Sequence, residues 1–206
     1  MMGKAQALAG TSRMAKDQRR QQLLDVAFAM IGEEGTDALT LARVAERAGV
    51  SKPIAYTHFG TRAGLLSALY RDYDERQTQA MRVAIETRAK ALSDVIAIVA
   101  ETYVDCTVSA GPEVSAIAAA LSGSEELEDV LQACRRNFTD ACRQAFAPFV
   151  DLRGPGGQAT LIAIIGVADA LSAAAAQRRL SRAAALETLR RALYGLLRHH
   201  KKARSG

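Results

Sequence analysis

The residues that most clearly suggest a chemistry lie on either side of Gly49, between Val44 and Tyr56. A helix-turn-helix packs two short helices at a steep angle. It therefore needs a small residue in the first helix, a glycine for the left-handed turn, and apolar residues on both sides. This spacing predicts a second helix whose N-terminal side chains project from the surface, where they can enter the major groove of DNA. The small residue, the glycine and the apolar residues are Ala45, Gly49, Leu41, Val44, Val50 and Ala55.

Helical periodicity and end signals place the elements around this turn. Apolar residues recur at helical spacing from Gln18 onward, and a glycine C-cap ends this first helix. Thr40 and Ser51 are the expected N-caps of the two short helices, because their hydroxyl oxygens can accept a hydrogen bond from a free backbone N–H. A fourth helix is expected from about Thr61 to beyond Ala80, which is long enough to link two domains.

The composition favours helices throughout the chain of 206 residues. Hydrophobic residues make up 49% and aromatic residues only 5%, and Ala and Leu outnumber the β-branched residues that a sheet needs. We therefore predict an all-α fold of about nine helices, with an N-terminal three-helix helix-turn-helix domain and a C-terminal helical domain. The later helices are expected at residues 91–108, 112–121, 125–150, 157–179 and 182–198.

Charge, cysteines and apolar runs bear on other classes of protein. The net charge is +5, but the basic excess is spread along the chain, so it permits a nucleic-acid partner without indicating one. Cys106, Cys134 and Cys142 lack the spacing of a disulfide framework or a zinc site, and no metal or cofactor is predicted. Residues 159–176 are apolar enough to suggest a membrane span, but Asp169 interrupts them, and a buried interface helix is the preferred interpretation.

Residues 18–75 resemble the N-terminal domain of the TetR family of transcription regulators. The likeness rests on the spacing around Gly49, on the following Tyr56-Thr57-His58-Phe59-Gly60-Thr61-Arg62, and on Leu65-Leu66. It implies a cytoplasmic, DNA-binding regulator, most often a repressor that a small-molecule effector releases from a palindromic operator. The C-terminal half resembles the family only in the number and length of its helices and in its final Ala-rich pair.

The resemblance also implies which residues contact DNA. Ser51, Lys52, Pro53 and Thr57 would face base edges or nearby phosphates, and Tyr56 would contact a phosphate or a thymine methyl group, unless it lies at the rim of the core. Phe59 is expected in the core, and His58 is either a structural histidine or a phosphate ligand. Pro53 and Gly60 depart from the common family pattern, so the phosphate contacts are expected to be fewer. The backbone contacts from the second and fourth helices would come from Thr40, Arg43 and Arg62.

A homodimer is expected, because one recognition helix reads only a few base pairs and a palindromic operator calls for two. The expected interface is the last helical pair, whose small residues let helices approach closely and whose leucines add apolar area. If these residues are not part of an interface, they belong to the internal core. They are Ala163, Gly166, Ala170, Ala173, Ala174, Leu189, Leu193 and Leu196.

The family's effector site lies among the middle helices, and candidates for its lining are the adaptable or aromatic residues there. Few converging polar groups are present, so an apolar effector is favoured, although Arg135 could pair with an anionic one. Plain core is the more common role for such residues, and a solvated face is the alternative for Arg135. The candidates are Tyr103, Cys106, Ile117, Leu121, Arg135, Phe138, Cys142 and Phe146.

The sequence predicts four segments along the chain. We expect a flexible basic arm at 1–17, a DNA-binding domain at 18–65, a ligand-binding and dimerisation domain at 66–200, and a disordered tail at 201–206. Basic residues of the arm could reach a neighbouring minor groove. An enzyme is not indicated, because the common metalloprotease, serine-hydrolase and P-loop motifs are absent. The alternative function is a helical protein-interaction module that does not bind DNA specifically.

Overall fold

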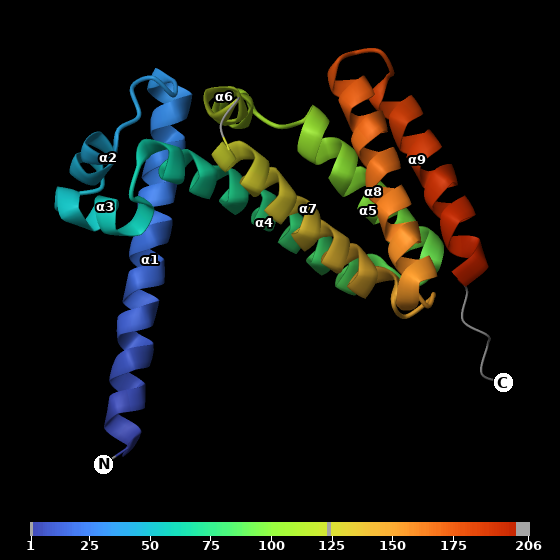
Figure 1. Cartoon of the computed structure of the whole chain (residues 1–206), viewed down its shortest axis with the longest axis horizontal. Helices are drawn as coiled ribbons and strands as arrows, with labels where there is room; N and C mark the ends of the chain where they lie inside the picture. Colours follow the sequence, from blue (N-terminus) through green and yellow to red (C-terminus); the bar gives the residue numbers. More distant parts are fainter. Residues whose placement is uncertain (1, 123–124, 201–206) are drawn as a thin grey trace. The chain divides into compact units, whose positions relative to one another are not determined.

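The computed structural model describes the backbone of residues 2–122 and 125–200, and the side chains of residues 15–122, 125 and 128–200. Across these residues the chain forms nine α-helices, a short 3-10 helix at Arg198–His200, and no extended strand (Figure 1). The predicted all-α class is therefore confirmed. The helices are α1 (Met2–Glu34), α2 (Leu41–Arg47), α3 (Lys52–Phe59), α4 (Arg62–Arg88), α5 (Leu92–Val108), α6 (Pro112–Leu121), α7 (Glu125–Phe146), α8 (Gly154–Ala176) and α9 (Arg182–Leu197).

Helices α1 and α8 begin earlier than the sequence predicted, and α7 and α8 end earlier, at Phe146 and Ala176. No break separates a basic arm at 1–17 from the first helix, because α1 begins at Met2. Residues 2–17 contain no proline and include four alanines, two lysines, two methionines and one leucine, which favour helix. The glycines at 154–157, expected to form a turn, lie in the first turn of α8, where Pro155 breaks no intrahelical hydrogen bond. The side chain of Arg13 and the predicted tail lie outside the described residues.

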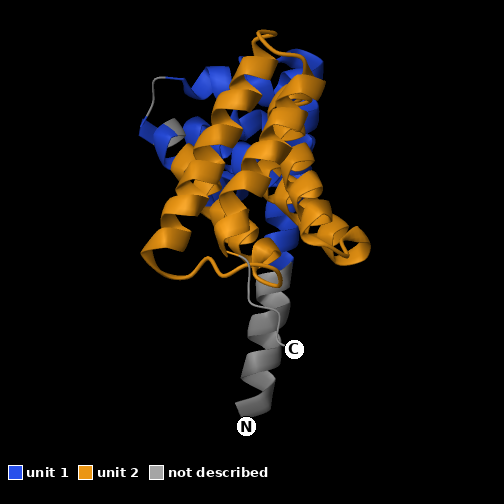
Figure 2. Ribbon diagram, turned by 90° about the vertical axis from the view of Figure 1, so that its right-hand side faces the viewer, with its two compact units in different colours: residues 1–72, 111–130 blue, residues 73–110, 131–206 orange. Residues whose placement is uncertain are grey.

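The chain divides into two compact units that differ from the predicted domains (Figure 2). Unit 1 comprises Met1–Asp72 together with Gly111–Val130, and unit 2 comprises Tyr73–Ala110 together with Leu131–Gly206. Helix α6 and the start of α7, up to Val130, therefore belong with the helix-turn-helix, whereas α5 belongs to unit 2. The reason is its apolar face, since Ile117 and Leu121 are buried in the core of unit 1.

Unit 2 is built around α5, α8 and α9, which pack against one another (Figure 1). Helix α8 has the length and hydropathy of a membrane span, and among the described helices it alone does. Its buried positions, which include Leu161, Ile164 and Ala168, nevertheless pack into the core of unit 2. Part of the apolar surface of α8 is thus buried inside unit 2. Cys106, Cys134 and Cys142, all of which the structure describes, form no disulfide bond with one another.

The turn between α2 and α3 has the geometry that the sequence predicts. Gly49 adopts the left-handed conformation with φ of +69°. Its N–H donates to the carbonyl of Glu46 at 3.1 Å, and the N–H of Val50 donates to the carbonyl of Ala45 at 2.9 Å. This pair of bonds is the Schellman arrangement, which satisfies two carbonyls at the end of a helix. Gly49 therefore sets the direction in which the chain enters α3.

Replacement of Gly49 by alanine should lower the free energy of unfolding by about 1–2 kcal/mol, because a Cβ is disfavoured at positive φ. No atom lies within 4 Å of the position that this Cβ would take, so the loss would come from the backbone alone. Gly49→Asn is the matched control, since asparagine tolerates this conformation better. Urea unfolding measures both variants, and an alanine variant no less stable than the asparagine variant would contradict the role of the turn.

Candidate nucleic-acid interface

Helix α3 presents its first residues to solvent. Ser51 is the N-cap, with extended backbone angles, and Pro53 lies in the first turn of the helix. Ser51, Lys52, Pro53 and Thr57 are all exposed. Tyr56 is 52% exposed, which excludes the alternative that it lies at the rim of the core. The residues expected to read DNA therefore lie on an open surface.

The polar groups of this surface are largely unused. Within the described part of the chain, the side chains of Ser51, Lys52 and Tyr56 have no hydrogen-bond or ion-pair partner. The hydroxyl of Thr57 donates to the carbonyl of Pro53 at 2.8 Å and keeps its acceptor capacity. The start of α3 thus offers a cation, hydroxyl groups and an aromatic ring to a partner outside the chain.

The opposite side of α3 fixes the helix in place. Ala55 is fully buried and Phe59 is almost so, as the spacing predicted, and both belong to the core of unit 1. This core also holds Val44 and Ala45 of α2. Since the packed and exposed sides of α3 are distinct, the exposed side chains are held outward on a supported helix.

Thr40 and Arg43 have partners within unit 1. The hydroxyl oxygen of Thr40 accepts a hydrogen bond from the backbone N–H of Arg43 at 3.2 Å and so caps α2 as expected. The guanidinium of Arg43 donates to the carbonyl of Ala38 at 2.9 Å and pairs with Glu34 at 2.6 Å. The hydrogen bond from Arg43 lowers the pKa of Glu34. Arg47 also pairs with Glu34, at 3.1 Å, so this side of α2 is tied to α1.

Arg62 likewise has an internal role. Its Nε donates to the carbonyl of Leu39 at 3.0 Å, and its Nη2 donates to the carbonyl of Thr36 at 2.6 Å. These bonds hold the connection between α1 and α2 against the start of α4. Sequence reasoning assigned Arg43 and Arg62 only to DNA, because their partners are carbonyls and a carboxylate distant in sequence. Both guanidinium groups are in fact engaged within the unit.

His58 is half-buried near the end of α3. Burial lowers its pKa, and the neighbouring cations Lys16, Arg20 and Arg19 lower it further, against a smaller opposing effect of Asp17. Because its pKa lies below the ordinary value of 6.5, the imidazole is neutral at pH 7. In the unliganded chain His58 can therefore offer a hydrogen bond to a phosphate, but not a charge.

The expected effector-site residues do not form one group. Ile117 and Leu121 lie in the core of unit 1, whereas Tyr103, Phe138, Cys142 and Phe146 lie in or against the core of unit 2. Cys106 is half-buried, and burial raises the pKa of its thiol to about 11. Burial also raises the pKa of Cys142. Neither thiol is therefore ionised at neutral pH.

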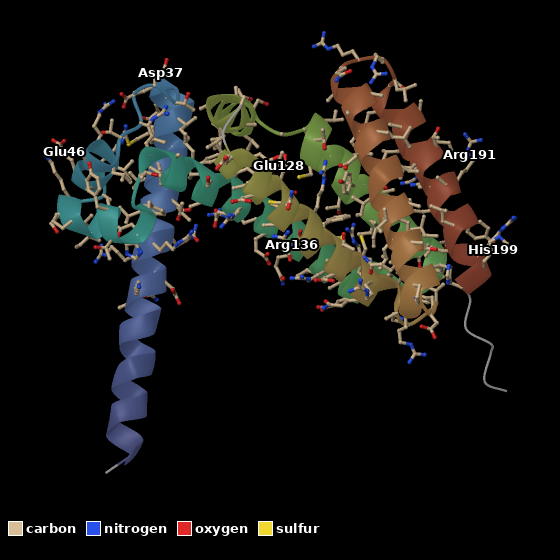
Figure 3. All side chains as sticks on the ribbon, viewed as in Figure 1. Asp37, Glu46, Glu128, Arg136, Arg191 and His199 are labelled. Carbon is tan, nitrogen blue, oxygen red and sulfur yellow. The ribbon has the colours of Figure 1, made fainter. Side chains whose placement is uncertain are left out.

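Unit 2 contains an open groove of about 550 Å³ between α7 and α8. Of the expected effector residues only Arg135 lines it, at 3.2 Å from the carboxylate of Asp169. Tyr103 donates a hydrogen bond to the same carboxylate, and burial raises the pKa of this phenol. Arg136, labelled on α7 in Figure 3, and Arg143 add two further cations. The spacing of these arginines along α7 could have indicated the groove from the sequence, but only Arg135 was predicted.

The expected dimer residues also separate into two sets. Ala174, Leu189 and Leu193 are buried inside their own unit, as the core alternative stated. Ala163, Ala173 and Leu196 are half-buried, and Gly166 and Ala170 are exposed. Two large apolar side chains that sequence reasoning passed over are exposed on the same helices: Ile162 at 63% and Tyr194 at 52%. An apolar surface thus remains on α8 and α9.

Comparison with known proteins identifies the helix-turn-helix. Residues 23–69 match the family model for bacterial regulatory proteins of the tetR family. The HTH-type transcriptional activator FasR of Mycolicibacterium smegmatis is 34% identical over 76 residues, which are 37% of this chain and 35% of FasR. The HTH-type transcriptional regulator BetI of Burkholderia ambifaria is 42% identical over 96 residues, which are 45% of this chain and 48% of BetI. The chain therefore matches less than half the length of these curated relatives.

Structural similarity extends further along the chain than sequence similarity. A TetR transcriptional regulator from Rhodococcus sp. RHA1 shares the fold with a TM-score of 0.65, at 19% identity, over 88% of this chain and 97% of that one. The chain thus shares a known all-α fold.

Replacement of Arg62 by glutamine should lower the free energy of unfolding by about 1–2 kcal/mol, because it removes two charge-assisted hydrogen bonds to backbone carbonyls. Arg88→Gln is the matched control, since Arg88 is an exposed arginine at the other end of α4. It should change stability by less than about 0.5 kcal/mol. Equal stability of the two variants in urea would show that Arg62 does not hold the α1–α2 connection.

Proposed function

Because the chain belongs to the TetR family, we propose that it is a transcription regulator that binds DNA through α3. The observation that carries this proposal is the exposed, unpartnered surface of Ser51, Lys52 and Tyr56, supported from beneath by Ala55 and Phe59. A helix of eight residues held in this way fits the major groove. Pro53 and Thr57 complete the reading surface. The DNA partner implies a cytoplasmic location.

The two sets of predicted DNA-binding residues are expected to contribute differently. Lys52 and Tyr56 can turn to DNA without losing an internal bond, since neither has one in the described chain. Thr40, Arg43 and Arg62 would have to share or give up hydrogen bonds that hold unit 1 together. We therefore assign most of the affinity to α3, and a supporting role to the ends of α2 and α4.

The regulator is proposed to act as a homodimer on a palindromic site. One α3 reads only a few base pairs, so specific binding calls for a second copy related by two-fold symmetry. The surface proposed for this contact contains Ile162, Gly166 and Ala170 of α8 and Tyr194 of α9, because these residues are exposed and mostly apolar. Ile162 and Gly166 also line the α7–α8 groove, so the proposed contact borders that groove. Small residues on α8 would allow two helices to approach closely.

A small-molecule effector is proposed to bind the groove between α7 and α8 and to release the operator, which would make the protein a repressor. In this groove Arg135 pairs with Asp169 and Arg143 with Asp140, whereas Arg136 makes no ion pair among the described residues. Ile162 and Ile165 supply apolar surface. This lining supports an effector with an anionic group and an apolar part, and not the purely apolar one expected from sequence. A ligand that binds better to one conformation would shift the population toward that conformation.

Lys52→Ala and Tyr56→Ala should each weaken binding to the selected operator by about tenfold, or about 1.4 kcal/mol, because each removes one contact with a base or phosphate. The melting temperature should stay unchanged, since both side chains are exposed. Lys90→Ala, which removes an exposed lysine from the α4–α5 connection, should bind like the wild type. Gel shifts at fixed salt, with an operator selected from genomic fragments, measure the affinities.

Two outcomes would contradict this assignment. A stability loss without an affinity loss would show that Lys52 and Tyr56 are structural. No specific shift with any genomic fragment would favour the alternative, a helical protein-interaction module.

Ile162→Asp should convert a dimer into a monomer, because it places a charge in the proposed apolar interface. Light scattering should give twice the chain mass of 22.0 kDa for the wild type and the single chain mass for the variant. Val83→Asp is the matched control, since Val83 is also an exposed apolar residue of unit 2 but lies on α4. A wild type that is monomeric at micromolar concentration would refute the dimer, and dissociation by both substitutions alike would refute this interface.

A further inference from the structure

Unit 1 contains a cavity of about 320 Å³ beside the C-terminal end of α3. It is lined by Arg20 of α1, by His58 and Phe59 of α3, by Ser67 and Arg71 of α4, and by Asp129 of α7. None of these residues lines the groove of unit 2, so the cavity is a separate feature. We propose that it binds an oxyanion of the phosphate class through Arg20, Arg71 and the hydroxyl of Ser67.

The hydroxyl of Ser67 is the first observation that points to a ligand. Ser67 is only 9% exposed, and its Oγ has no hydrogen-bond partner among the described residues. Helical hydroxyls usually donate to the carbonyl one turn earlier. Thr57 and Thr87 do so, at 2.8 Å and 2.7 Å. Because native proteins rarely leave a buried hydroxyl unpaired, that of Ser67 is well placed to serve a group within the cavity.

The two arginines are the second observation. Arg71 follows Ser67 by four residues, so both lie on the same side of α4. Arg20 comes from α1, and its guanidinium carbon lies 5.6 Å from the centre of the Phe59 ring. In the described part of the chain neither guanidinium forms an ion pair. A guanidinium can donate two parallel hydrogen bonds to two oxygens of a phosphate or carboxylate. An anion between Arg20 and Arg71 would therefore be bound by both side chains.

The remaining groups set the charge of the site. Asp129 is the one acidic residue in the lining, and within the described chain it makes no ion pair with either arginine. Two guanidinium groups and one carboxylate give the lining a net positive charge. His58 adds no charge to it, because its lowered pKa keeps the imidazole neutral at pH 7. His58 can still donate a hydrogen bond to an oxyanion. The lining thus suits an anion better than a cation or an uncharged molecule.

The position of the cavity suggests what its occupancy would do. An oxyanion held by Arg20 of α1 and Arg71 of α4 would lie against His58 and Phe59, at the end of α3. It would therefore link the last turn of the exposed helix to two neighbouring helices. A bound anion would stabilise unit 1 and fix the orientation of α3.

Inorganic phosphate tests the site in the absence of DNA, so that its result does not depend on the proposed function. Phosphate is titrated against chloride at constant ionic strength, and NMR follows the amide resonances of Ser67, of His58 and of Gly64, which also lines the cavity. We expect saturable shifts at these positions. Arg71→Gln and Ser67→Ala should each weaken the affinity about tenfold, since each removes a hydrogen bond to a charged group. Arg88→Gln, which removes an exposed arginine from the same helix, should leave it unchanged.

The result that would overturn the proposal is a shift that does not saturate, or one that Arg71→Gln and Ser67→Ala leave as in the wild type. The fold of each variant is checked in the same spectra, and Ser67→Ala favours helix. A second titration with operator DNA present identifies the source of the oxyanion. Displacement of phosphate by DNA would mean that a backbone phosphate occupies the site, and retention would mean that a free anion does. Either result supports an oxyanion site.

Discussion

The left-handed turn at Gly49 is the constraint on which the proposed DNA-binding surface depends. Its positive φ and the hydrogen bonds from Gly49 and Val50 end α2 and set the direction of α3. From that direction follow both sides of α3: Ala55 and Phe59 reach the core, and Lys52 and Tyr56 remain in solvent. Ion pairs from α2 to Glu34 and the bonds of Arg62 hold the surrounding elements. A local backbone feature thus becomes a surface that can read DNA.

The features that sequence could predict are those that depend on neighbouring residues. Gly49, the cap Thr40, and the apolar spacing of α2 and α3 act within one or two helical turns, and the structure has them as predicted. Ser51 takes the N-cap position of α3 but, against the prediction, its side chain makes no capping hydrogen bond. Arg43 and Arg62 were different, because their partners lie up to 26 residues away and are known only once α1, α2 and α4 have packed. The sequence also did not predict that α6 belongs to unit 1, because this depends on packing between distant residues. It did not predict that α1 begins at Met2, because the residues before Gln18 carry only weak signals for a helix end.

Charge is placed more selectively than the net value suggests. The excess of basic residues is small and spread along the chain, yet arginines gather at the α7–α8 groove of unit 2 and at the cavity of unit 1. Several arginines, among them Arg135 and Arg143 of that groove, pair with carboxylates, and Arg62 donates hydrogen bonds to carbonyls inside the fold. Asp169 illustrates the difficulty for sequence reasoning: it interrupts an apolar run, and in the fold it joins Tyr103 of α5 to Arg135 of α7. Position, and not composition, decides which charges are available to a partner.

Protection of guanine N7 from methylation tests the central claim most directly, because this atom is accessible only from the major groove. If two copies of α3 read DNA, the operator should show two protected sites about one helical turn, or a multiple of it, apart. The Lys52→Ala variant should lose part of this protection at equal occupancy. Specific binding that leaves every guanine N7 reactive would contradict the account, since it would mean that the surface held outward by Gly49 does not enter the groove.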